Sequence, residues 1–271
     1  EDIAYNGQLV FEEKILEIIE NLKHLMPNVR KIALSGGVFA NVKLNKKINE
    51  IDWVEEVFVT PAMDDNGLPL GCALTTHKLF NPSFKPFKLQ DTFLGVKYWN
   101  NEFYYDKSKF IERPYDEKEI AYDLKAGKVI GWFQGRHEHG PRALCNRSII
   151  ADPSVPGTYK KVNDRLQRND NMPFAPVVLD DYADEIFNVT KSRYTAEFMT
   201  MLYDTHLEWH DKIPAVVHPV DKTARIQIVT PTSNNKFYDL LTKFHALTQI
   251  PVLLNTSFNV HGEPIVCHPK E

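Results

Sequence analysis

The sequence KIALSGGVFANVKLNKKINEIDWVEEVFVTP, residues 31–61, decides the fold class. An apolar strand at its start is followed by the glycine pair Gly36-Gly37, a helical run from Ala40 towards Ile48, and a second strand over residues 54–61. A strand, a helix and another strand in this order are typical of parallel or mixed sheets that helices cover. We therefore predict an α/β protein.

The flanking segments extend this pattern. Apolar residues recur at helical spacing from Ile15 to Leu25, and an apolar helix is predicted from Leu70 to about Leu79. A further helix over Glu117–Lys125 ends at Gly127. Helices are also predicted at residues 162–168 and 235–250, and extended segments at residues 128–135, 173–179, 224–230 and 251–255.

Composition bounds the class of protein. The 271 residues suffice for one large domain or two ordinary ones, and a hydrophobic share of 43% with 25% charged residues is that of a globular protein. A net charge of −4 gives no sign of a nucleic-acid partner, and no apolar run is long enough to span a membrane. Three scattered cysteines, Cys72, Cys145 and Cys267, form no disulfide framework, so we expect a cytoplasmic protein.

The segment from residue 86 to residue 116 differs from its surroundings. It is rich in Pro, Phe, Tyr and Lys and has no clear periodicity. Its aromatic residues indicate a packed crossover, because disordered linkers are poor in such groups. We predict that it connects a first domain, residues 1–85, to a second, residues 117–271.

The sequence GWFQGRHEHGPRALCNRSII, residues 131–150, has the composition of an anion pocket. Arg136, Arg142 and Arg147 each offer a planar fork of donors, and Gly135 and Gly140 allow the backbone to approach a ligand closely. A solvated basic loop is the alternative. Glu138 could pair with one of these arginines or act as a base.

Two other segments offer polar ligand groups. PVLLNTSFNVHGEPIV, residues 251–266, runs from an apolar strand into Asn255, Thr256, Ser257 and Asn259, at a strand end where α/β sheets commonly bind ligands. The glycine pair after the first strand could cradle a nucleotide at a helix N-terminus. Alternatively, it merely allows close packing.

The motifs resemble those of a known family. GRHEHGPRALCNRSI resembles the GRxExGPRALGNRSI signature of the O-carbamoyltransferases of nodulation-factor and antibiotic biosynthesis, with Cys145 in place of a glycine. NTSFNVHGEPIV resembles their second signature, and the similarity extends upstream through IALSGGVFANVKLNKKI and PAMDDNGLPLGCAL. The resemblance implies the end of an actin-like domain, like that of tRNA threonylcarbamoyl transferases. It also implies a following domain like threonylcarbamoyl-adenylate synthases, with a twisted mixed sheet.

The resemblance also implies a reaction. Carbamoyl phosphate and ATP would form carbamoyl-adenylate, and the carbamoyl group would pass to the hydroxyl of a small-molecule acceptor with the help of Fe²⁺; Mg²⁺ could accompany the nucleotide. Arg136, Arg142 and Arg147 are the expected catalytic clamp on phosphate. The expected binding residues are Gly36, Gly37, Asn41, Asn146, Ser148, Arg165, Arg168, Asn255, Thr256, Ser257 and Asn259.

The implied metal site is incomplete in this sequence. PAMDDNGLPLG matches the motif whose aspartate binds iron in the family, and the ligand position falls on Asp65. The partner HxxxH motif does not occur before Asp65, so transfer could need an upstream domain or a second chain. His137 and His139 form an HxH pattern without an evident third ligand, and we expect them to be solvated or hydrogen-bonded.

Two other functions stay open. The chain could be a non-catalytic module that binds a nucleotide or anion in the same pocket. A synthase of the tRNA threonylcarbamoyl pathway is less favoured, because GPRAL and NTSFN match the O-carbamoyltransferases better.

Overall fold

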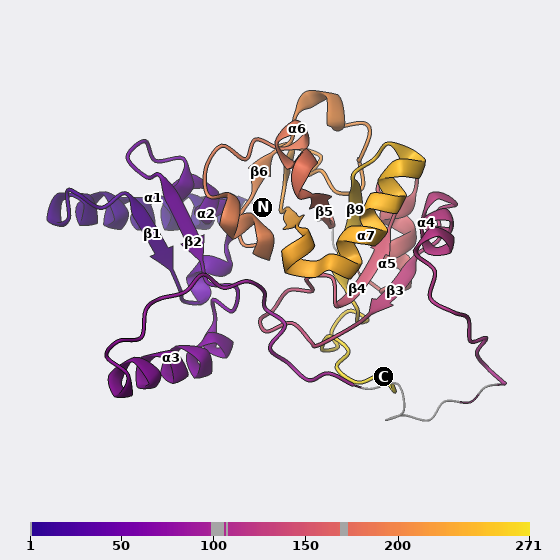
Figure 1. Cartoon of the computed structure of the whole chain (residues 1–271). Coiled ribbons are helices and arrows are strands. Elements are labelled where there is room, and N and C mark those ends of the chain that lie inside the picture. Colours follow the sequence, from indigo (N-terminus) through magenta and orange to yellow (C-terminus); the bar gives the residue numbers. More distant parts are fainter. Residues whose placement is uncertain (1, 99–105, 107, 169–172) are drawn as a thin grey trace.

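The strand-helix-strand segment predicted at residues 31–61 forms a small parallel sheet. The computed structural model describes residues 2–98, 106, 108–168 and 173–271 (Figure 1). Strands β1 (Lys31–Leu34) and β2 (Glu56–Val59) pair in parallel, joined by the turn η1 (Gly37–Ala40) and helix α2 (Val42–Asn49). The predicted α/β class is confirmed.

Two longer helices belong to the same part of the chain as this sheet. Helix α1 (Asp2–Leu25) buries Glu12 and Ile19, and the short turn η2 (Asp65–Gly67) leads into α3 (Leu68–Phe80). Both helices were predicted, α1 with a later start. Figure 1 shows α3 apart from the sheet, and none of its residues is buried. Within the described residues, no helix combines the length and apolar character needed to cross a bilayer.

A larger mixed sheet follows in the chain. Its strands lie in the order β3-β4-β9-β5-β8, and β5 and β8 are its one parallel pair; the other neighbours are antiparallel. The mixed sheet predicted for this part of the chain is confirmed. The strands are β3 (Ile130–Phe133), β4 (Arg147–Ala151), β5 (Ala175–Leu179), β8 (Gln227–Val229) and β9 (Val252–Ser257).

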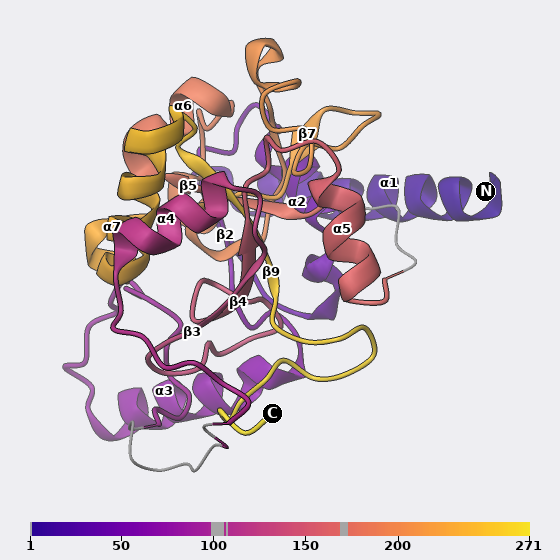
Figure 2. The same ribbon diagram turned by 90° about the vertical axis from the view of Figure 1, so that its right-hand side faces the viewer.

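Helices cover both faces of this sheet. Figure 2 shows α4 (Glu117–Lys125) and α7 (Pro231–Thr248) on one side and α5 (Thr158–Arg165) on the other. Successive strand residues point to opposite faces, so Ile150 packs in the cluster beneath α4 and α7 while Ile149 belongs to the other core cluster. That second cluster continues into α2 and β2, so one core joins the two sheets.

The free edge of β2 is closed by side-chain hydroxyls. The Val57 N–H donates to Ser192 Oγ at 2.6 Å, and the Val59 N–H donates to Thr195 Oγ1 at 2.9 Å. Thr195 belongs to η4 (Arg193–Phe198). This segment therefore replaces a neighbouring strand and fastens the small sheet to the rest of the molecule.

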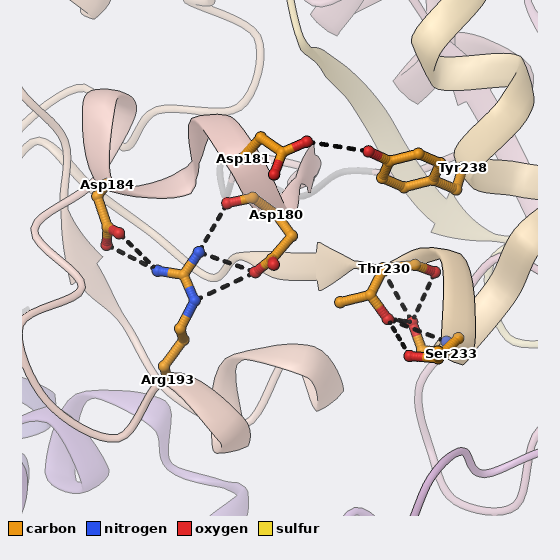
Figure 3. A network of polar contacts seen from close by, with 8 residues as sticks. Asp180, Asp181, Asp184, Arg193, Thr230, Ser233 and Tyr238 are labelled. Atoms are coloured by element: carbon orange, nitrogen blue, oxygen red, sulfur yellow. Dashed lines mark hydrogen bonds and ion pairs between the residues drawn. The ribbon is translucent and has the colours of Figure 1, made fainter.

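An ion-pair network holds η4 in place (Figure 3). Arg193 Nη1 donates to both carboxylate oxygens of Asp184 at 2.8 Å, and Nη2 donates to Asp180 Oδ1 at 2.8 Å. These aspartates lie in η3 (Asp180–Tyr182) and α6 (Ala183–Ile186). These charge-assisted contacts hold the guanidinium of Arg193 between the two aspartates.

Two features differ from the sequence predictions. The extended segment predicted at residues 224–230 is divided between β8 and the short strand β7 (Thr223–Ala224), which pairs with β6 (Tyr203–Asp204). Strand β4 was not predicted, because its first residues belong to the polar arginine-rich loop. Part of the predicted 86–116 connection lies outside the described residues; within the rest, Lys97 forms an isolated bridge with Arg136.

Candidate functional site

A cavity of about 840 Å³ lies between the small sheet's helices and the larger sheet. A volume of this size suits a nucleotide-sized ligand. Both parts of the chain line it, including Gln8 of α1 and Asn41, the N-cap of α2. Its other polar lining includes Lys43, Arg142, Arg168, His218, Asp221, Arg225, Asn255, Thr256, Ser257 and Asn259.

Three arginines concentrate positive charge on this cavity. The Nε atoms of Arg142 and Arg225 are buried without a hydrogen-bond partner. Arg168 Nη1 donates to Thr256 Oγ1 at 3.4 Å, and its guanidinium lies 4.8 Å from the Phe174 ring centroid. Burial, followed by the charges of Arg142 and Arg168, lowers the pKa of Arg225. An anion in the cavity would relieve this repulsion and supply the missing partners.

The end of β9 adds amide groups. Asn255 Nδ2 donates to Gln227 Oε1 at 2.9 Å and to the Ala143 carbonyl at 3.1 Å, while its Oδ1 is buried without a partner. Asn259 Oδ1 is likewise without a partner, although its Nδ2 donates to the Glu263 carbonyl at 2.8 Å. Because both residues line the cavity, ligand N–H groups are suitable donors for these oxygens.

Two of the three arginines expected in the phosphate clamp contact backbone carbonyls of the protein and do not reach the cavity. Arg147 is fully buried; its Nη1 donates to the carbonyls of Gln134 at 2.6 Å and Asn146 at 2.9 Å, and its guanidinium carbon lies 3.6 Å from the Phe133 ring centroid. Arg136 is exposed, and its Nε donates to the Gly95 carbonyl at 2.8 Å. Neither lines the cavity. Both instead donate to backbone carbonyls and so help to hold the loop that contains Arg142.

Three further predicted residues also lie away from the cavity lining. Asn146 Nδ2 donates to the Arg136 carbonyl at 2.8 Å, and Ser148 Oγ accepts the Cys145 N–H at 3.1 Å. Arg165 is exposed at the end of α5. Of Arg165 and Arg168, both expected to bind ligand, the structure therefore brings only Arg168 to the cavity lining.

The glycine pair and Asp65 lie at another place. Gly36, Asp64 and Asp65 line a separate cavity of about 450 Å³, and Gly37 does not. The Gly36 N–H donates to the Met63 carbonyl at 2.6 Å, so this donor is already used within the protein. Across the described ranges no group of three metal-ligating side chains gathers, so the residues beside Asp65 do not fit a complete iron site.

Arg225 was not among the site residues predicted from the sequence. It lies between β7 and β8, where the predicted continuous strand is broken, and this break is what places its side chain on the cavity. The signal was present, since an arginine within an otherwise apolar strand pattern is unusual. His218 and Asp221 were also missed; His218 Nδ1 lies 2.9 Å from Asp221 Oδ1 on the same cavity.

Comparison with known families gives two matches. The profile described as "Carbamoyltransferase C-terminus" matches residues 121–271, which is more than half of the chain. The profile described as "Carbamoyltransferase N-terminus" matches residues 1–74.

Several curated proteins are similar along nearly the whole chain. Nodulation protein NolNO of Sinorhizobium fredii is 34% identical over 278 residues, covering 98% of this chain and 40% of the relative. The 3'-hydroxymethylcephem-O-carbamoyltransferase of Amycolatopsis lactamdurans is 32% identical over 255 residues, covering 94% and 47%. The chain spans about half the length of the curated relatives it matches. Among solved structures, full-length HypF in its phosphate- and nucleotide-bound form aligns with a TM-score of 0.42 and 16% identity, over 59% of this chain and 19% of that one.

Proposed function

The chain belongs to the carbamoyltransferase family, and we propose that it forms carbamoyl-adenylate from carbamoyl phosphate and ATP for transfer to the hydroxyl of a small-molecule acceptor. The observation that carries this proposal is the cluster of Arg142, Arg168 and Arg225 on one nucleotide-sized cavity. Both substrates are anionic, and adenylation spreads charge over phosphoryl oxygens in the transition state. Preorganised guanidinium groups are suited to that charge.

The amide groups suit the other end of the donor. A carbamoyl group presents an NH₂ and a carbonyl oxygen, and the buried acceptors of Asn255 and Asn259 could take its N–H bonds. Thr256 and Ser257 add hydroxyls at the same strand end. We place the reaction in the cytoplasm, which the three free cysteines favour.

Transfer to the acceptor is a separate step in this proposal. The family resemblance assigns it to an actin-like domain with bound Fe²⁺, to which Asp65 would contribute a carboxylate. Since the described residues near Asp65 do not complete a metal site, we propose that an upstream domain or a second chain supplies the other ligands.

The experiment is a pyrophosphate-release assay. Pyrophosphate should appear from ATP only when carbamoyl phosphate is present. Arg142→Ala should weaken the binding of the anionic substrates by about 1.5 kcal/mol or more, because a charged hydrogen-bond partner of the ligand is lost. Arg165→Ala is the matched control, since Arg165 is exposed and does not line the cavity. Absence of pyrophosphate release, together with absence of binding of either substrate, would rule the proposal out.

A second candidate is a non-catalytic module that binds a nucleotide or anion in the same cavity. The incomplete metal site favours it for the transfer step. Calorimetric binding of ATP without carbamoyl-phosphate-dependent turnover would favour the module. Turnover by the isolated chain would exclude it.

A further inference from the structure

Glu138 holds three backbone donors of the arginine-rich loop. Its side chain is buried, and its Oε1 accepts the N–H groups of Leu144 at 2.8 Å, Asn146 at 2.8 Å and Arg147 at 3.0 Å. Hydrogen bonds to a carboxylate are stronger than those between neutral groups. Glu138 Oε1 therefore accepts three of the four backbone N–H groups of residues 144–147.

The backbone at Cys145 makes this convergence possible. Cys145 has φ of 75°, in the left-handed region that favours glycine, and the family signature has glycine there. Its own N–H turns away and donates to Ser148 Oγ. Successive N–H groups around such a left-handed residue form a concave nest that commonly binds an external anion. Here the protein's own carboxylate fills the nest.

Arg142 lies within the loop that this carboxylate closes. The bond from Leu144 to Glu138 joins the two ends of residues 138–144, and Asn255 holds the Ala143 carbonyl from β9. The guanidinium of Arg142 is thus presented from a segment fixed on both sides. Glu138 does not line the cavity itself.

We propose that Glu138 is a positioning residue, an internal anion that fills the backbone nest and fixes the loop that presents Arg142 to the cavity. A bound phosphate is then held by side chains and not by the loop's N–H groups. This inference rests on the proposed anion-binding function. It differs from a role of Glu138 as a base, because it requires an acceptor oxygen and no proton transfer.

Two variants separate these roles. Glu138→Ala removes the acceptor and should weaken binding of inorganic pyrophosphate at least about tenfold, the factor that corresponds to losing one charge-assisted contact. Glu138→Gln keeps an acceptor oxygen and should bind pyrophosphate within about threefold of the wild type. Glu185→Ala, which alters an exposed carboxylate elsewhere, is the control. Calorimetry on the whole chain gives all four affinities.

Amide hydrogen exchange tests the loop independently of ligand binding. Exchange at Leu144, Asn146 and Arg147 should quicken in Glu138→Ala and stay slow in Glu138→Gln. Formate, a small carboxylate that could enter the vacated nest, should partly restore both slow exchange and pyrophosphate affinity in the alanine variant. A role in general stability alone would not give this rescue.

These measurements distinguish failure of the proposed role of Glu138 from failure of the proposed function. If the wild type does not bind pyrophosphate, amide exchange alone tests the nest, and the pyrophosphate-release assay separately tests the proposed function. The inference is overturned if Glu138→Ala binds like the wild type, or if Glu138→Gln loses binding as fully as alanine. It is also overturned if Glu138→Gln binds normally but loses turnover, since that would identify a base. Should the alanine variant not fold, the glutamine variant decides.

Discussion

The proposed anion site predicts that Arg225 serves binding at the expense of stability. Its Nε is buried without a partner, and two like charges lie near it on the cavity. Replacing a buried, uncompensated charge by an apolar side chain of similar volume is often stabilising. We therefore expect Arg225→Met to raise the unfolding free energy by about 1 kcal/mol in anion-free buffer. Urea denaturation measures this change.

The same variant should lose its response to ligand. Pyrophosphate should stabilise the wild type by mass action, and this stabilisation should be nearly absent in Arg225→Met. Arg165→Met, at an exposed position, should change neither quantity. A variant less stable than the wild type in anion-free buffer would show that Arg225 has compensating contacts.

For single residues, the sequence motifs predicted which residue types gather near the cavity better than where each side chain points. Arg142 and Asn255 were predicted for the ligand pocket and line the cavity. Arg147, five positions after Arg142, is turned into the protein by β4, a strand that the polar loop concealed. Arg225 was missed because residues 224–230 were predicted as one strand, in which successive side chains point to opposite faces of the sheet. The break between β7 and β8 interrupts that alternation at Arg225.

Among the elements, those with strong local signals were predicted well. Helix α4 has the predicted bounds, with Asp116 as its N-cap and Gly127 just beyond its end. The parallel pairing of β1 and β2 followed from the helix between them. What covers the edge of β2 could not be predicted, because Ser192 and Thr195 lie more than 130 positions away in the sequence.

The hydroxyls of Ser192 and Thr195 at the edge of β2 should stabilise the fold. Ser192→Ala leaves the buried N–H of Val57 without its acceptor, and Thr195→Ala does the same for Val59. Each substitution should lower the unfolding free energy by about 1–3 kcal/mol, the cost of an unpaired buried donor. Thr190→Ala is a matched control at an exposed site. Urea denaturation with all three variants decides; equal, small losses would mean that the edge is not sealed by these hydroxyls.

Across the whole molecule, the cavity depends on a close approach between its two parts. Gly140 has φ of 119°, and a Cβ there would lie 3.0 Å from the Pro61 carbonyl oxygen. The arginine-rich loop therefore meets the segment before Asp65 at a point where only glycine fits without strain. The sequence predicted both parts and the glycine, but the contact between them needs the shared core that joins the two sheets.

Stability of the whole chain should depend on the ionisation of Glu197, in η4 at the junction of the two parts. Burial is the largest effect and raises the pKa of Glu197 to about 7 from an ordinary value of 4.5; Asp180 raises it further, while Lys88 and Arg193 oppose the rise. Because the folded state binds this proton more tightly than the unfolded state, the protonated carboxyl contributes stability that is fully present below pH 4.5 and is lost as the pH rises through 7.

The unfolding free energy of Glu197→Gln should match that of the wild type near pH 4.5. At pH 8 it should exceed the wild-type value by about 1–2 kcal/mol, discounted for the solvent-accessible part of the side chain. Urea denaturation at several pH values measures this difference, with Glu208→Gln as an exposed control. A difference between wild type and Glu197→Gln that does not change with pH would show that Glu197 does not titrate between the two states, and that the junction tolerates a buried carboxylate through its neighbouring cations.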